Sequence, residues 1–305
     1  MDNLNVYQPS GKFSPFSFIF FLLVAVTALP ILGLVYAYCI WYIPFIYINF
    51  IIALAFGFIT GLAINIFVIG KGKVRNVNIA RLFGLAGALV AMYFHWSVWV
   101  DLVINAGEQI GTGKYGITVS NISIFQVFSL AIDPSTLFMI IEEIQKVGTW
   151  GLKGNTVSGP FLYVIWGVEA LLIIVPAVIV TTAKSRMPYC EMSDTWFKEI
   201  QLPEFNIVAD INAIIENISN NQDEFINDLT FVENTEQHHM VITLFTSEYS
   251  DNYLTIEKKI ASLDKDNKVK LDTTTIVEYL HVDKKLVTQL LSHKPVTVNL
   301  GEQSS

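Results

Sequence analysis

FSPFSFIFFLLVAVTALPILGLVYAYCIWYIPFIYINFIIALAFGFITGLAINIFVIG, residues 13–70, is the stretch that decides the fold. It contains no Lys, Arg, Asp or Glu, and it is too long and too apolar to be the core of a soluble domain. A membrane-spanning helix needs about 20 apolar residues, so the stretch holds two spans. We place the break between them at residues 41–44, because aromatic residues suit a membrane interface and proline disfavours continuation of a helix.

A basic loop predicts the orientation of the spans. Lys71, Lys73, Arg75 and Arg81 follow the second span, and basic residues concentrate in cytoplasmic loops. The N-terminus and the C-terminus are then both cytoplasmic, as in a multi-pass protein of the cell membrane. The four spans are expected at residues 16–38, 46–70, 82–104 and 159–182.

The connection between the third and fourth spans is too long for a simple loop. Residues 122–132 are apolar, and Asp133 and Pro134 supply an N-cap and a first-turn proline for a helix over residues 134–147. Each helix is too short to cross a membrane, so we expect an extracytoplasmic pair of short helices, either re-entrant or flat on the surface. Trp41 and Trp150 are expected at the membrane interfaces.

The charge composition changes near residue 183. Residues 1–183 hold eight Lys or Arg and seven Asp or Glu, whereas residues 184–305 hold eleven and twenty. An acidic segment argues against nucleic acid and anionic lipid as partners, because both attract basic surfaces. We therefore expect a membrane domain over residues 1–183, a tether over 184–202 and a cytosolic domain over 203–300.

The tail has the pattern of a small α+β domain. Apolar residues at helical spacing follow Pro203 as far as Ile218, and Asp283 is a candidate N-cap for a last helix. Between these helices, three strand-like segments separated by turn-rich connections predict an antiparallel meander over residues 239–245, 253–260 and 269–277. The predicted fold class is a mainly α integral membrane protein with four transmembrane helices, an outer helix pair and this α+β domain.

Two ionisable residues lie deep inside the predicted spans. At 1.5 Å per residue, His95 lies about 20 Å from the inner end of the third span, and Glu169 about 15 Å from the outer end of the fourth. In a hydrocarbon core about 30 Å thick these depths nearly coincide, which predicts an intramembrane polar pair. Such a pair joins two helices, carries a proton or an ion, or belongs to a ligand or catalytic site.

Small residues mark one face of the second span. Ala53, Gly57 and Gly61 lie four residues apart, a spacing that lets two helices approach closely. We expect this face to pack within the monomer in preference to forming a dimer contact. Asp101, near the outer end of the third span, is expected to be a solvated charge at a helix end.

No motif in the sequence indicates a catalytic or metal site. Residues 107–114 end like a phosphate-binding loop but have Glu108 where that loop needs glycine, and Tyr115 follows in place of serine or threonine. Cys190 lacks the second cysteine of a zinc knuckle, because Ser193 occupies its position. We therefore expect no catalytic residue, no bound metal and no cofactor.

Three functions are compatible with these patterns. The first is a membrane-anchored interaction, sensing or complex-subunit protein without enzymatic activity, acting through its cytosolic domain. Its partners would be the lipid bilayer and another protein or a second copy, without nucleic acid. The alternative is a small oligomeric transporter, channel or proton-coupled subunit that uses His95 and Glu169. A membrane enzyme acting on lipid is the third.

Overall fold

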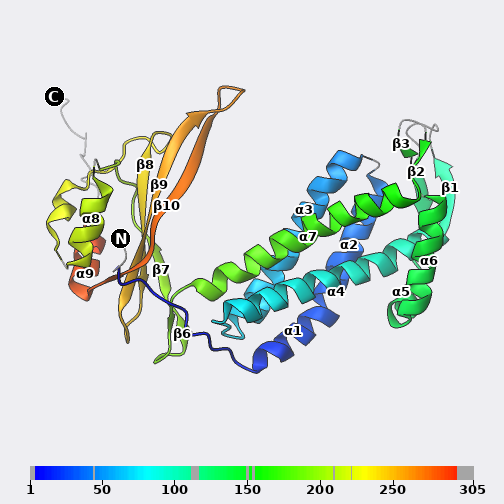
Figure 1. The fold of residues 1–305 in the computed structure, drawn as a ribbon, viewed down its shortest axis with the longest axis horizontal. Coiled ribbons are helices and arrows are strands. Elements are labelled where there is room, and N and C mark those ends of the chain that lie inside the picture. The colour runs from blue at the N-terminus through cyan, green and yellow to red at the C-terminus, as the bar shows by residue number, and fades with distance from the viewer. Residues whose placement is uncertain are drawn as a thin grey trace, which may run out of the picture. The chain divides into compact units, whose positions relative to one another are not determined.

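The protein divides into two compact units, each described here by itself (Figure 1). The helical unit is Ser10–Arg186, and the sheet unit combines Met1–Pro9 with Met187–Ser305. The computed structural model describes residues 4–43, 45–110, 117–148, 151–152, 155–208, 210–220 and 222–293.

The helical unit contains the long apolar helices. Among the described residues, four stretches are long and apolar enough to cross a membrane. This confirms the prediction of four apolar segments of spanning length. They are Phe16–Tyr42, Ile46–Gly70, Val77–Ile104 and Pro160–Arg186.

The first of these stretches is broken into α1 (Phe16–Val26) and α2 (Ala28–Tyr42). Pro30 has no N–H, and its ring crowds the carbonyl of the residue four positions earlier, Val26. The backbone leaves helical geometry beside that carbonyl, at Thr27 (φ −121°, ψ −73°). The Thr27 hydroxyl donates to the Leu23 carbonyl at 2.5 Å. The break therefore lies about one turn before the proline that causes it.

The remaining long helices pack on one another. The second stretch is α3 (Ile46–Ile64) followed by a π-helical turn, η1 (Asn65–Gly70). The third is α4 (Val77–Ile104), which begins before residue 82 because the Asn76 side chain accepts hydrogen bonds from the first N–H groups. The fourth, α7 (Pro160–Arg186), packs against both α3 and α4, while α2 packs on α4.

Two short helices connect α4 to α7. α5 (Ile124–Ile132) and α6 (Pro134–Val147) are bent by 105° at Asp133, whose side chain accepts a hydrogen bond from the Thr136 N–H at 3.2 Å. The predicted pair of short helices is present: α6 has the predicted ends, and α5 begins at Ile124 where residue 122 was expected. Two hairpins flank it: β1 (Ala106–Ile110) with β2 (Ile117–Ser120), and β3 (Gly151–Leu152) with β4 (Asn155–Thr156).

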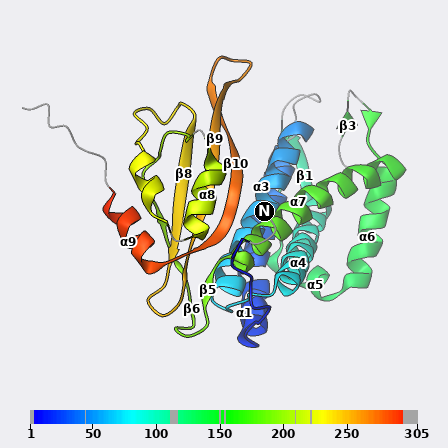
Figure 2. The ribbon, with the colours of Figure 1, turned by 60° about the vertical axis from the view of Figure 1, so that its left-hand side comes forward.

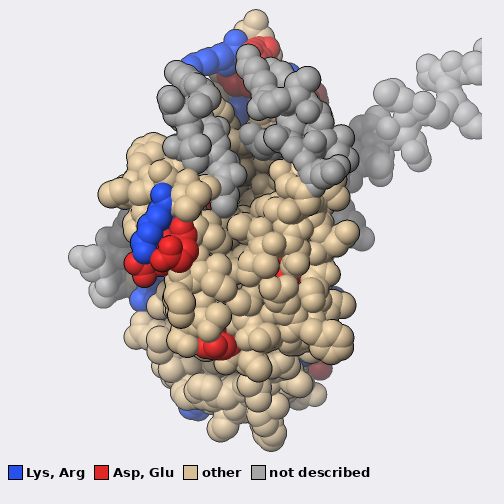
Figure 3. All heavy atoms as spheres, turned by 90° about the vertical axis from the view of Figure 1, so that its right-hand side faces the viewer, with Lys and Arg blue, Asp and Glu red and all other residues tan. Residues whose placement is uncertain are grey.

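The short helices have one buried face and one exposed apolar face. Leu130, Leu137 and Ile141 pack in a cluster with residues of α4. On the exposed faces, Phe125 is 90% and Phe138 60% exposed. Seen from the side of α5 and α6, the surface is mostly free of charged side chains (Figure 3). Apolar faces of this kind suit contact with lipid, whether the pair is re-entrant or lies at the interface.

The sheet unit is built on an antiparallel sheet with the strand order β10-β9-β8-β7. Both α8 (Ile211–Ser219) and α9 (Lys284–Ser292) lie on one face of it (Figures 1 and 2). The predicted antiparallel sheet is therefore confirmed. Its strands are β7 (Lys198–Gln201), β8 (His239–Thr246), β9 (Asn252–Leu263) and β10 (Val269–Val282).

Residues 184–202 differ from the expected tether. After α7 ends they form a hairpin of β5 (Tyr189–Cys190) with β6 (Thr195–Trp196), and then β7, which pairs with β8 at the edge of the sheet. The helix predicted from Pro203 begins only at Ile211, where the Asp210 side chain caps it by accepting from the Ala213 N–H. Phe205, inside the expected helix, instead forms antiparallel bridges with Phe231 and Met240, so pairing with distant segments has overridden the local helical pattern.

The N-terminal residues also belong to the sheet unit and not to the helical unit. Val6 forms an antiparallel bridge with Leu280 of β10. The Tyr7 N–H donates to the Tyr279 carbonyl at 2.9 Å, and the His281 N–H donates to the Asn5 carbonyl at 2.8 Å. The N-terminus thus adds a short strand to the β10 edge.

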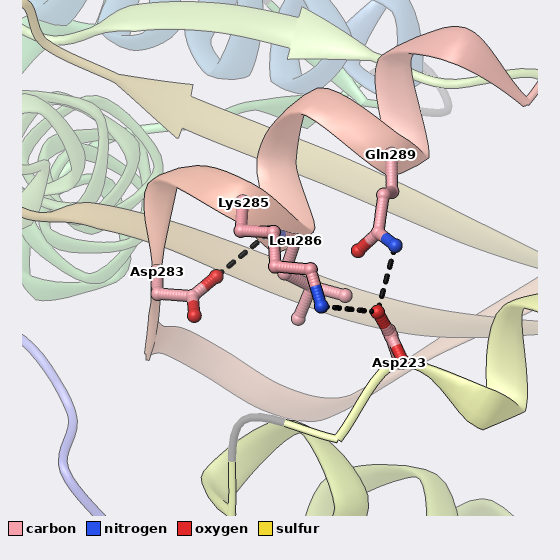
Figure 4. Close-up of polar contacts among 5 residues, drawn as sticks. All are labelled: Asp223, Asp283, Lys285, Leu286 and Gln289. Atoms are coloured by element: carbon pink, nitrogen blue, oxygen red, sulfur yellow. Dashed lines mark hydrogen bonds and ion pairs between the residues drawn. The ribbon is translucent and has the colours of Figure 1, made fainter.

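A polar contact ties α9 to the short 3-10 helix η2 (Glu224–Asp228) (Figure 4). Asp283 caps α9 as predicted, accepting from the Leu286 N–H at 2.7 Å. The Asp223 carboxylate accepts from Lys285 Nζ at 2.8 Å and from Gln289 Nε2 at 2.7 Å. The Lys285 hydrogen bond, followed by that of Gln289, lowers the pKa of Asp223, so this carboxylate is ionised at neutral pH.

Candidate functional site

His95 and Glu169 both contact a third polar residue, Tyr36. The Tyr36 hydroxyl on α2 donates to Oε1 of Glu169 on α7. The Tyr36 ring also lies against the imidazole of His95 on α4, with centroids 4.6 Å apart and planes tilted by 58°. Among the described residues, His95 and Glu169 are therefore connected through Tyr36 and not by a direct ion pair.

His95 is almost completely enclosed, as Tyr36 is. Its side chain is only 3% exposed, and its Nδ1 has no hydrogen-bond partner among the described residues. A buried polar nitrogen without a partner is costly in a protein interior and more so in lipid. Within the group, His95 is therefore the residue with an unmet hydrogen bond. A proton or a polar ligand atom would be stabilised most at its Nδ1.

Close helix crossings set the position of Tyr36. Gly33, one turn before Tyr36, lies so near α4 that a Cβ added there would come within 2.8 Å of the His95 backbone nitrogen. On the other side, Phe56 of α3 stacks on the Tyr36 ring, with centroids 4.3 Å apart and planes 3° from parallel. The site thus takes one side chain from each of the four long helical stretches.

The small residues of α3 fix the helix that carries Glu169. A Cβ added to Gly57 would collide with the backbone of Ile173, and one added to Gly61 would lie 2.9 Å from Ala177 Cα. Ile173 and Ala177 follow Glu169 by one and two helical turns on α7, on the same face. Ala53, on the same stripe of α3, is fully buried. The stripe packs within the monomer, against α7.

Aromatic side chains fill the space between α4 and α7 beside the site. Trp166 makes edge contacts with Trp96 and Trp99, at centroid distances of 4.8 and 6.4 Å, and with Tyr163 at 5.7 Å. Tyr93, on the turn of α4 before Trp96, donates through its hydroxyl to the Ala131 carbonyl of α5 at 2.8 Å. The α5–α6 pair is therefore bonded directly to the helix that carries His95.

Asp101 is buried, which corrects the expectation that it is a solvated charge. Its side chain has no exposed surface. One carboxylate oxygen accepts from the Ser123 N–H at 2.9 Å, and the other accepts from Asn105 Nδ2 at 3.1 Å. Ser123 immediately precedes α5, so Asp101 joins the end of α4 to the start of the α5–α6 pair.

Of the two tryptophans expected at membrane interfaces, Trp41 is among the described residues and Trp150 is not. Trp41 lies near the end of α2, and its Nε1 donates to the Thr118 carbonyl of β2 at 2.9 Å. Its neighbour Tyr42 donates through its hydroxyl to the Ser120 carbonyl at 3.0 Å. Both contacts hold the end of α2 against the β1–β2 hairpin. Trp150 lies outside the described residues.

Tyr36 is the functional candidate that sequence reasoning missed. It lies in a span that also contains Tyr38, Trp41 and Tyr42, so its residue type does not distinguish it. A carboxyl group, a phenol and an imidazole that contact one another in a row are able to hold and pass a proton. In the described part of the chain, no group of three or more His, Cys, Asp or Glu side chains is placed to bind a metal ion.

Within the described part of the sheet unit, the thiol of Cys190 has an unusual environment. The side chain is 1% exposed. Burial raises the pKa of this thiol, but hydrogen bonds from Ser193, Ser247 and Ser250 together outweigh burial and bring the pKa to about 6. A thiolate is therefore favoured at neutral pH, in a position closed to large reagents.

No family model, no curated protein and no solved structure matches this chain. Its class therefore follows from its own residues. It is a membrane protein in which four described stretches are long and apolar enough to span, with an antiparallel sheet in its C-terminal region.

Proposed function

We propose that this chain is a membrane-anchored interaction, sensing or complex-subunit protein that works through its sheet unit. The observation that carries the proposal is the pairing of residues 5–7 with β10. These residues precede α1, whereas the rest of the sheet unit follows α7. The sheet is thus connected to the first and the last apolar stretch, and a partner that binds it acts on both.

The same pairing supports a topology with both ends in the cytoplasm. Strand pairing between the N-terminal segment and β10 requires both to lie on one side of the membrane, and hence an even number of crossings. This favours four spans, with α5 and α6 entering and leaving on one face instead of forming a fifth span. Lys71, Lys73 and Arg75 favour the cytoplasm for the side that holds both ends.

Association with a partner is tested by removal of the sheet unit. We expect the full chain, purified from its native membrane in mild detergent, to bring a second protein with it in fixed stoichiometry. Deletion of residues 194–305 should leave the apolar helices inserted but abolish that association. A partner that still copurifies with the shortened chain would contradict the proposal.

A pair of proline variants tests the sensing part of this proposal. Tyr7→Pro removes the N–H that bonds to the Tyr279 carbonyl, so it should release the N-terminal strand and weaken partner-dependent changes in the helical unit. Gln8→Pro is the matched control, because no described hydrogen bond uses its N–H. Equal effects of the two variants would show that the strand pairing does not transmit binding.

A second candidate function, a proton-coupled subunit or small oligomeric transporter, is favoured by the Tyr36 contact and by the unpartnered Nδ1 of His95. In this function Glu169 takes up a proton, and Tyr36 lies between it and His95. A carboxyl group held inside a membrane is costly unless it is paired, which favours a working role for it.

Glu169→Gln tests the second candidate. Gln keeps an oxygen that accepts from Tyr36 but cannot release a proton, so expression and thermal stability should stay close to those of the parent while flux into liposomes is lost. Glu142→Gln on exposed α6, where Glu142 pairs with Lys146 at 3.4 Å, should leave flux unchanged. If Glu169→Gln instead lowers the yield of folded protein, the role of Glu169 is to hold the helices together.

A further inference from the structure

The outer edge of β10 is only partly covered. β10 is the last strand of its sheet, and the N-terminal segment pairs with it only around Leu280. In the described part of the chain, residues 269–275 pair with β9 alone. Both ribbon views show the tip of the β9–β10 hairpin projecting past β8 (Figures 1 and 2). We call residues 269–275 the open edge.

The backbone groups of Leu271 point away from β9. Leu271 lies opposite Ala261, and the Ala261 N–H donates to Nδ1 of His238, just before β8, at 2.9 Å. Opposed residues of an antiparallel pair either exchange both hydrogen bonds or direct their backbone groups outward. The pair of Ala261 with Leu271 is of the outward kind, and by alternation Val269 and Thr273 also point outward. These three residues of the open edge therefore present N–H and C=O groups that another strand is able to bind.

The hairpin tip is neutral, although the tail around it is acidic. Residues 260–272 hold three Lys and three Asp, whereas residues 184–305 together hold eleven Lys or Arg and twenty Asp or Glu. Two copies of the chain are therefore able to approach at the tip without the repulsion that an acidic surface produces. Lysine on an edge strand often prevents pairing between chains. Whether it does so here depends on what lies opposite each lysine.

The sequence around Leu271 is complementary to itself in the antiparallel direction. When Leu271 lies opposite Leu271 of a second copy, Lys270 lies opposite Asp272 of that copy, and Asp272 lies opposite its Lys270. These charges share one face, where Lys270 and Asp272 of one chain already form an ion pair at 2.6 Å. On the other face, Val269 and Leu271, 45% and 38% exposed, come together with the same residues of the second copy.

The symmetry of this pairing suits two chains in one membrane. The two-fold axis passes beside Leu271, perpendicular to the sheet, so both sheets keep the same face on the same side. Met187, the residue after α7, packs in a cluster with Phe245. Phe245 lies on the opposite face of β8 from Leu244, which packs with α8 and α9. Both copies then present Met187 on the same side of the joined sheet.

We propose that two copies of this chain pair through their open edges, antiparallel about Leu271, and join two four-stranded sheets into one. Addition of a strand to an exposed sheet edge is a common mode of recognition, and here backbone direction, charge and apolar contact all fit a second copy. The pairing rests on the proposed function, because it names a second copy as a partner of the sheet unit. An extended segment of another protein is the competing occupant.

Disulfide crosslinking of the full-length chain in membrane vesicles tests the register. Cys39 and Cys190 are first replaced by serine. Only a residue beside the two-fold axis faces itself, so Leu271→Cys should form a disulfide-linked dimer under mild oxidation. Thr273→Cys is the matched control on the same edge. Its two copies would lie about 13 Å apart along the strands, beyond the reach of a disulfide.

A crosslink between two different variants checks the same register. Val269 lies opposite Thr273 of the second copy when Leu271 lies on the axis. Val269→Cys and Thr273→Cys, carrying different tags, should therefore link to each other when they are coexpressed, although neither should link to itself.

Charge reversal tests the pairing without any cysteine replacement. Lys270→Glu makes the facing charges all acidic, and Asp272→Lys makes them all basic. Each variant alone should lose the dimer at a concentration where the parent is half dimeric, as measured by light scattering in detergent. An equimolar mixture should regain it, because positions 270 and 272 of the two variants then carry opposite charges. Glu248→Lys, exposed in the β8–β9 turn at the other end of β9, should leave the dimer unchanged.

Three outcomes would overturn the proposal. The first is equal crosslinking of Leu271→Cys and Thr273→Cys. The second is a mixture of the two charge variants that stays as monomeric as each variant alone. The third is a link from Leu271→Cys to a different protein in place of a second copy, which would assign the open edge to a segment of that protein. If the dimer fails while a partner that requires residues 194–305 still copurifies, the proposed function stands and only the pairing is wrong.

Discussion

Gly57→Ala is expected to destabilise the helical unit strongly. The added Cβ would meet the backbone of Ile173 on α7, and a backbone atom cannot move aside as the end of a flexible side chain can. Overpacking costs about 1–3 kcal/mol where neighbours are able to adjust, and more where they are not. This exceeds the gain of about 1 kcal/mol that alanine brings to a helix in place of glycine.

Gly167→Ala is the matched control on the partner helix. A Cβ at Gly167 has no atom within 4 Å, so alanine should keep or slightly raise the stability of α7. The comparison is made by the yield of monodisperse protein in detergent and by its thermal unfolding midpoint. If Gly57→Ala unfolds at the same temperature as the parent, α3 and α7 do not cross closely at Gly57.

The apolar helices could be predicted well from the sequence because lipid imposes a simple requirement. About 20 uninterrupted apolar residues are needed whatever the neighbours are, and residues 46–70 were predicted with the ends that Ile46–Gly70 has in the structure. Local chemistry was also sufficient for the bend at Asp133 and for the Asp283 cap, because each depends on residues within one turn of the helix.

Contacts between distant segments could not be predicted in this way. Asp101 looks like a charge at a helix end, and its burial depends on the backbone of Ser123, which is 22 residues later. β7 has no strong strand pattern of its own and is defined by pairing with β8. The depths of His95 and Glu169 could be estimated from helical rise, but the position of Tyr36 depends on the close crossing of α2 and α4 at Gly33.

Phe205→Ala is expected to cost the sheet unit about 3–5 kcal/mol, the usual range for removing a buried phenylalanine. Phe205 has no exposed surface, its backbone exchanges two hydrogen bonds with Met240 at 2.9 and 2.7 Å, and its ring packs on Phe231 at 5.2 Å. A domain of this kind is stable by about 5–15 kcal/mol, so the loss takes a large share. Limited proteolysis should therefore cleave the sheet unit of the variant well before that of the parent.

The helical unit of the Phe205→Ala variant should keep its resistance to protease, because the hydrophobic cores of the two units share no residue. Tyr249→Ala removes an aromatic side chain that is 60% exposed, and its effect on the sheet unit should lie within about 0.5 kcal/mol. Simultaneous cleavage of both units in Phe205→Ala would mean that the sheet supports the helices. Binding at the sheet would then act on the helical unit through the stability of the fold itself, and not only through the N-terminal strand.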